Sequence, residues 1–193
     1  MHDLPDTDEA DAAAERYWPD FFKWVLKTNL KEKVEKALLE EQAFSSFHQG
    51  LYSGSFPTYE AFIGRLAEGV AMGAENGLDD RMDEIHRALV RDLPFPPRGL
   101  YAVYFWPDPF DEPLGSLLYR EVFEEFRSHP VYRHIHEDHY HSHWTFDEFI
   151  DHLAHGAVAG ARNGADKTLG DIYRAFIYET PLPAFRRRPR RVR

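Results

Sequence analysis

Apolar side chains recur at helical spacing in two segments of the chain that lie 87 positions apart. The first segment carries Phe62, Ile63, Leu66, Ala67, Val70, Ala71 and Ala74. The second carries Phe149, Ile150, Leu153, Ala154, Ala157, Val158 and Ala161. Thr58 and Thr145 stand at N-cap positions, and Thr145 with Glu148 has the form of a capping box. Asn-Gly pairs at 76–77 and 163–164 are typical of helix ends, so each segment is predicted to form a helix of about 16 residues.

Further helices are predicted on both sides of these segments. Asp79 and Asp166 are expected to cap a second helix, which stops before Pro94 or Pro181. Its apolar stripe holds Met82, Ile85 and Leu89 in the first case and Leu169, Ile172 and Phe176 in the second. A third helix upstream is marked by Leu30, Val34 and Leu38, and again by Leu118, Val122 and Phe126. A short helix is expected to begin at Pro130.

The chain reads as two copies of one unit of about 80 residues. Trp18-Pro19-Asp20 returns as Trp106-Pro107-Asp108, and the apolar stripes above match residue for residue. We therefore predict an all-α fold, with three long helices plus one short helix in each repeat, and both repeats fused into one bundle with pseudo-two-fold symmetry. The predicted boundaries are an acidic arm at 1–16, repeat 1 at 17–96, a linker at 97–104, repeat 2 at 105–183 and an arginine-rich tail at 184–193. The conformation of residues 100–106 stays open.

Glycines run along one side of the predicted central helix of each repeat, at positions Gly69, Gly73, Gly156 and Gly160. A glycine inside a helix costs about 1 kcal/mol relative to alanine, so these positions need a physical reason. The close approach of two helix backbones supplies one, and we predict that the two glycine-bearing helices cross each other. Dimerisation within a membrane is not predicted, because Arg65 and Glu68 lie on the same helix.

Charge is distributed unevenly along the chain. The formal net charge is -10, although the C-terminal end carries Arg186, Arg187, Arg188, Arg190, Arg191 and Arg193. Without these six arginines the remainder carries -16. Such a body is expected to repel nucleic acid and anionic membranes, whereas the tail attracts them. A tail that serves only solubility is one alternative, and a tail that lies on the acidic body as an intramolecular clamp is another.

The residue types also restrict the compartment and the kinds of site. The chain contains no cysteine, which excludes disulfides and thiolate metal sites. No apolar run approaches the ~20 residues that a membrane span needs, and the first sixteen residues are acidic where a signal peptide would be basic. We therefore predict a soluble cytoplasmic protein without a membrane partner.

Histidine is concentrated in the second repeat. Eight of the eleven histidines fall between His129 and His155, whereas the matching stretch of the first repeat contains only His48. Imidazole is a good ligand for divalent zinc, nickel or iron, and two rings one helical turn apart can chelate a single ion. The candidate metal ligands are His136, His139, His143, Glu148, His152 and His155. Two alternatives stay open: a solvated histidine-rich segment, and a surface that changes shape between about pH 5 and pH 7.

No catalytic template occurs in the sequence: there is no nucleophile elbow, phosphate-binding glycine loop or dinucleotide fingerprint. The leading hypothesis is a non-enzymatic protein-interaction module whose acidic body binds a basic partner. An immunity or antitoxin-type protein is an example by analogy only. The alternative is a histidine-rich metal-binding protein, or a metal-dependent enzyme, with its site in repeat 2. A third hypothesis has the arginine-rich tail dock on nucleic acid.

Overall fold

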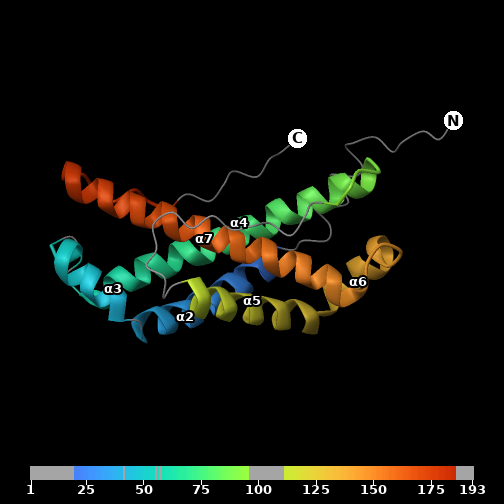
Figure 1. Cartoon of the computed structure of the whole chain (residues 1–193), viewed down its shortest axis with the longest axis horizontal. Coiled ribbons are helices and arrows are strands. Elements are labelled where there is room, and N and C mark those ends of the chain that lie inside the picture. The colour runs from blue at the N-terminus through green and yellow to red at the C-terminus, as the bar shows by residue number, and fades with distance from the viewer. Residues whose placement is uncertain (1–19, 41, 55, 57, 96–110, 186–193) are drawn as a thin grey trace.

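The computed structural model describes residues 20–95 and 111–185, apart from 41, 55 and 57 (Figure 1). Every regular element in this part of the chain is a helix, which confirms the all-α prediction. The elements are α2 (Asp20–Glu40), α3 (Gln42–Phe47), the π-helical turn η1 (His48–Tyr52), α4 (Tyr59–Val90), α5 (Asp111–Ser128), α6 (Pro130–Ile135), the π-helical turn η3 (His136–Tyr140) and α7 (Phe146–Tyr178). None of these described helices combines the length and the apolar character that a bilayer crossing requires.

The helices form two layers. In one layer α4 and α7 cross each other, and in the other α2 packs on α4 while α5 packs on α7. Figure 1 shows α2 and α5 on the same side of the α4–α7 crossing, with α3 at one end of the molecule and α6 at the other. Because α2 and α5 also contact each other, the four long helices enclose one common core.

The buried positions are those that the apolar pattern predicts. Leu30, Val34 and Leu38 on α2 are at most 4% exposed, and Leu118, Val122 and Phe126 on α5 at most 2%. On the crossing helices, the side chains of Phe62 and Phe149 are 0% exposed. Burial of each such side chain stabilises the fold by about 1.5–3 kcal/mol, which makes this core the main source of stability.

The predicted boundary inside each central segment is wrong, because α4 and α7 are continuous helices of 32 and 33 residues. Both run through the Asn-Gly pairs without a break. Asp79 and Asp166 are interior residues of these helices and not the N-caps of new ones. Within the described residues, each half of the chain therefore contains two long helices where the sequence predicted three.

The left-handed residues that follow these helices lie elsewhere. No described glycine has a positive φ, whereas Asp92 has φ 51° and Glu179 has φ 49°. Glu179 comes directly after the end of α7, and Asp92 comes two residues after the end of α4. Gly77 and Gly164 end no helix because they belong to the glycine stripes, where the absent side chain serves helix packing.

Helix backbones approach each other so closely at the α4–α7 crossing that no side chain fits. A Cβ atom built on Gly77 would lie 2.6 Å from Cα of Gly160, and one built on Gly164 would lie 2.8 Å from Cα of Gly73. The facing pairs are Gly69 with Gly164, Gly73 with Gly160 and Gly77 with Gly156. The predicted crossing of two glycine-bearing helices is confirmed.

Local sequence signals set the starts of α4, α6 and α7, as predicted. The Thr58 hydroxyl accepts a hydrogen bond from the Ala61 amide at 3.1 Å. Thr145 and Glu148 form the reciprocal capping box, with the two amide bonds at 2.8 and 3.3 Å. Helix α6 begins at Pro130.

Some predictions fall outside the described residues: those on the arm at 1–16, the linker at 97–104, the conformation of residues 100–106 and the tail from Arg186 onward. The boundaries of the two repeats and their pseudo-two-fold relation stay predictions.

Candidate functional site

Two buried histidines, one in each π-helical turn, form hydrogen bonds to the loop that leads into the next long helix. His48 and His136 are each 8% exposed. Nε2 of His48 lies 3.0 Å from the carbonyl oxygen of Phe56, and Nε2 of His136 lies 2.7 Å from the carbonyl oxygen of Trp144. Because a carbonyl oxygen only accepts, Nε2 carries the hydrogen in both rings. These contacts give both imidazoles a structural role.

Three of the other predicted metal ligands have separate surroundings. Glu148 closes the capping box of α7. The ring of His152 stacks on Trp144, with centroids 4.5 Å apart. His143 makes an edge contact with Phe95 at 5.4 Å. Each of the three has a different direct neighbour, although the rings of Phe95 and Trp144 contact each other at 4.2 Å.

His155 belongs to a small polar cluster that joins α5 to α7. The Tyr119 hydroxyl donates to Oδ1 of Asp151 at 2.5 Å, and Nε2 of His155 lies 3.4 Å from the same oxygen. The rings of Tyr119 and His155 are 5.1 Å apart. The last predicted ligand, His139, lies beside Tyr140 on η3 with ring centroids 6.2 Å apart. The cluster of Tyr119, Asp151 and His155 therefore joins α5 to α7, with the Asp151 carboxylate as the shared acceptor.

No three His, Asp or Glu side chains come together as metal ligands within the described part of the chain. All six predicted ligands lie in that part, so the structure does not bring them together as a set of three. A zinc, nickel or iron site on these residues stays a prediction, to which these contacts add no support.

Tyr140, at the end of η3, is 1% exposed and stacks on Phe149 with ring centroids 5.0 Å apart. Burial disfavours the phenolate and raises the pKa of Tyr140 from 10.0 to about 12. The folded state therefore favours the neutral phenol. The corresponding stability is fully present below about pH 10 and is lost as the pH rises through about 12.

Raising the pH from about 9 to about 12 should lower the free energy of unfolding of Tyr140→Phe by about 2 kcal/mol less than that of the wild type. The reason is that phenylalanine has no proton to release. Urea unfolding at the two pH values measures the difference. Tyr173→Phe, at an exposed position, is the matched control and should follow the wild type. Identical pH dependence in all three proteins would contradict the prediction.

A groove of about 660 Å³ runs across the α4–α7 crossing. Its lining comes from α4, α7 and the residues after α7, and no described residue of α2 or α5 contributes. The floor consists of the two glycine stripes: Gly69, Gly73, Gly77, Gly156, Gly160 and Gly164. These six positions lack side chains because the two helices meet there, so the floor of the groove is made of backbone from both helices.

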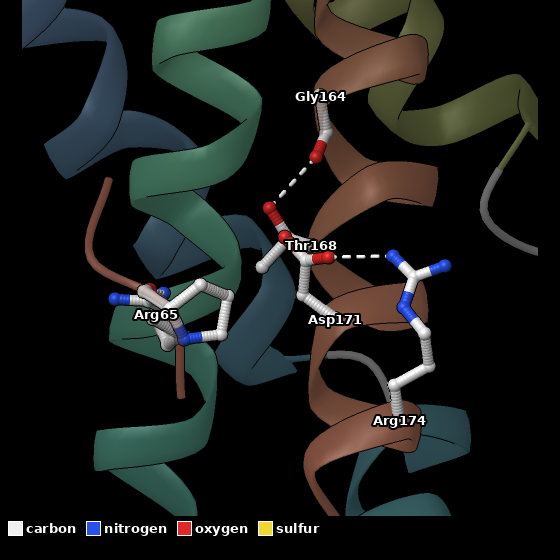
Figure 2. Close-up of polar contacts among 6 residues, drawn as sticks. Arg65, Gly164, Thr168, Asp171 and Arg174 are labelled. Carbon is white, nitrogen blue, oxygen red and sulfur yellow. Dashed lines mark hydrogen bonds and ion pairs between the residues drawn. The ribbon is translucent and has the colours of Figure 1, made fainter. Parts of the chain in front are cut away.

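Polar side chains stand along the walls of this groove. The amides of Asn76 and Asn163 make no hydrogen bond to any described residue, and Lys167 makes no ion pair with one. The Thr168 hydroxyl is different, because it donates to the carbonyl oxygen of Gly164 at 2.7 Å (Figure 2). Each side-chain amide offers donors and an acceptor, so the groove presents hydrogen-bonding groups that no described residue uses.

The segment that follows α7 forms part of the wall at one end of the groove. A guanidinium nitrogen of Arg65 donates to the carbonyl oxygen of Pro183, and the same group lies 3.7 Å from the ring centroid of Phe185. Figure 2 shows Arg65 on α4, with Thr168 and Asp171 on α7. Burial lowers the pKa of Arg65, and the charge of Asp171 acts in the opposite direction.

The sequence pattern predicts the glycines as helix contacts and does not predict a site beside them. The available signal was the position of Asn76 and Asn163, each one residue before a glycine of the stripe. If the Asn-Gly pairs end helices, neither asparagine belongs to the helix face that carries the glycines. With the helices continued, both amides fall beside the glycine floor.

Comparison with known proteins identifies no relative: no family model, no curated protein and no solved structure matches the chain. The fold and the site define a crossed-helix bundle with a polar groove over a glycine floor, and its function has to be argued from that geometry.

Proposed function

We propose that this protein is a non-enzymatic interaction module that binds a basic protein partner in the cytoplasm. The observation that carries the proposal is the exposed apolar end of α7. There Tyr173, Phe176, Ile177 and Tyr178 are 49%, 44%, 49% and 71% exposed. Contiguous exposed apolar side chains mark interaction surfaces, and aromatic residues are enriched in them.

The exposed residues are spaced to form one contact surface. Tyr173, Phe176 and Ile177 are three and four positions apart, which places them on one side of α7. The residues 87 positions earlier on α4 are only partly exposed, and these are His86, Leu89 and Val90. Of the two crossing helices, α7 is therefore the one whose described end exposes this apolar surface, which favours one partner site over two equivalent ones.

Net charge supports a basic partner. The chain carries -10 overall and -16 without its six C-terminal arginines. A body with this charge attracts cationic surfaces and speeds encounter with them. Screening by salt should weaken the complex.

We expect immobilised full-length protein to capture one stoichiometric basic protein from native lysate and to release it at high salt. The double variant Tyr173→Ser/Ile177→Ser should reduce capture at least about tenfold, because buried aromatic and aliphatic anchors dominate interface energies. Leu93→Ser is the matched control, since Leu93 is 52% exposed but follows α4. Absence of any stoichiometric partner, or equal capture by all three proteins, would count against the proposal.

We also propose that the two halves of the chain are copies of one unit related by a pseudo-two-fold axis. Residues on such an axis contact their own counterparts. Two such contacts support the proposal: Gly73 faces Gly160 between α4 and α7, and Lys33 pairs with Glu121 between α2 and α5. The partners in these contacts are 87 and 88 positions apart, the spacings of the sequence repeat. An experimental structure in which residues 30–95 and 118–183 failed to superpose would refute it.

A further inference from the structure

We propose that the groove across the α4–α7 crossing binds an extended polypeptide segment in which a proline stands two positions before a large aromatic residue. The chain's own segment from Pro183 to Phe185 lies at one end of the groove and has this pattern. A segment of the same chemistry from another protein would bind by displacing it.

The resident segment identifies the chemistry that the groove recognises. Arg65 contacts it twice, through the hydrogen bond to the carbonyl oxygen of Pro183 and through the stack on Phe185. The first contact binds a backbone group that any residue offers, and the second selects an aromatic ring. Residues 181–185 form no helix, and the two prolines of the segment favour extended backbone. One end of the groove is therefore bordered by a short, non-helical, proline-containing segment of the chain itself.

Beyond this segment the groove continues over the glycine floor between Asn76 and Asn163. An extended chain presents alternating N–H and C=O groups, and a side-chain amide can donate to one and accept from the other. The glycines allow a peptide backbone to come close to both helices at this point. The groove volume of about 660 Å³ lies within the usual range for binding pockets.

The charges along the groove favour a polypeptide over a small ion. Asp80 and Asp171 bring negative charge to the lining, and Arg65 and Lys167 bring positive charge. A site for an anion or a cation concentrates one sign of charge, whereas here each of the two walls carries both signs. A peptide backbone, which is neutral and carries both donors and acceptors, matches this lining.

The groove and the apolar end of α7 are separate surfaces. Lys167, Thr168 and Asp171 line the groove, whereas Tyr173 and Ile177 lie on a different side of the same helix. The groove proposal goes beyond the proposed function, because it names a second site with its own ligand. Failure of either site in its test leaves the other unaffected.

The test measures binding of a fluorescent synthetic peptide with the sequence of residues 181–185 to full-length protein by polarisation. In the wild type the resident segment competes with the added peptide. Phe185→Ser removes the stacked ring of the resident segment, so we expect this variant to bind the peptide at least about tenfold more tightly than the wild type. Phe185→Tyr keeps an aromatic ring on Arg65 and should bind like the wild type.

A second substitution tests the anchor. Adding Arg65→Ala to Phe185→Ser should abolish the gain, and adding Arg65→Lys should also reduce it, because lysine lacks the planar group that stacks. A peptide ending in alanine instead of phenylalanine should fail to bind Phe185→Ser. Thermal unfolding of each variant confirms that it is folded. Equal peptide binding by wild type and Phe185→Ser, or a gain that survives Arg65→Ala, would overturn the proposal.

Discussion

Gly160→Ala is expected to lower the free energy of unfolding by about 3–5 kcal/mol, an exceptionally large effect for one methyl group. The added Cβ would overlap the carbonyl oxygen of Gly73 and lie 2.5 Å from Cα of Gly77. Both obstacles are backbone atoms of α4, which cannot rotate away as a flexible side chain can. The two helices must therefore separate, and the core side chains packed beside the crossing lose contacts with them.

Gly170→Ala on the same helix is the matched control. Its added Cβ would have no neighbour closer than 3.8 Å, at the end of the Arg174 side chain. Alanine there should stabilise the protein by about 0.5–1 kcal/mol, because a helical glycine loses more conformational entropy on folding. Urea unfolding followed by circular dichroism compares the two variants. Similar destabilisation by both would mean that the helices do not meet at Gly160.

His136→Ala is the second substitution with a large expected effect, a loss of about 3 kcal/mol. The ring fills a buried space beside Phe146 and Phe149, at centroid distances of 5.6 and 5.8 Å. Its removal leaves a cavity and deprives the Trp144 carbonyl oxygen of its 2.7 Å hydrogen bond. Both costs arise in the folded state, so they add to the destabilisation.

His141→Ala provides the comparison within the same histidine-rich segment. His141 is exposed, and its substitution should change stability by less than about 0.5 kcal/mol. The measurement also separates the structural role of His136 from a role as a metal ligand. If the role of His136 is structural, its substitution lowers the free energy of unfolding by the same amount with and without a chelator. A cost that disappears when EDTA is present in both proteins would restore the metal hypothesis.

The sequence predicted those features of the fold that local chemistry determines. Apolar spacing marks the buried faces of α2 and α5, and the residue pair Thr145 and Glu148 sets the start of α7. The continuity of α4 and α7 could not be predicted in this way. An Asn-Gly pair disfavours helix by only about 1–2 kcal/mol, and the packing of a whole helix against its neighbour outweighs that preference.

The candidate site was harder to predict than the fold. The number of histidines between residues 129 and 155 says nothing about where the rings point, and His136 turns to a carbonyl group eight residues further on. The groove depends on contacts between residues remote in sequence: Arg65 and Pro183 are 118 positions apart. No local pattern contains such information.

The helix crossing also has a consequence for the order of folding events. Gly73 and Gly160 meet across 87 positions of sequence, so their contact must wait until a long stretch of chain has closed. The closest contact between α4 and α7 is therefore one of the least local, and we expect it to form after the transition state. Gly160→Ala should accordingly speed unfolding and leave the refolding rate nearly unchanged. A contact that is absent from the transition state stabilises only the native state, so its loss changes the unfolding rate alone.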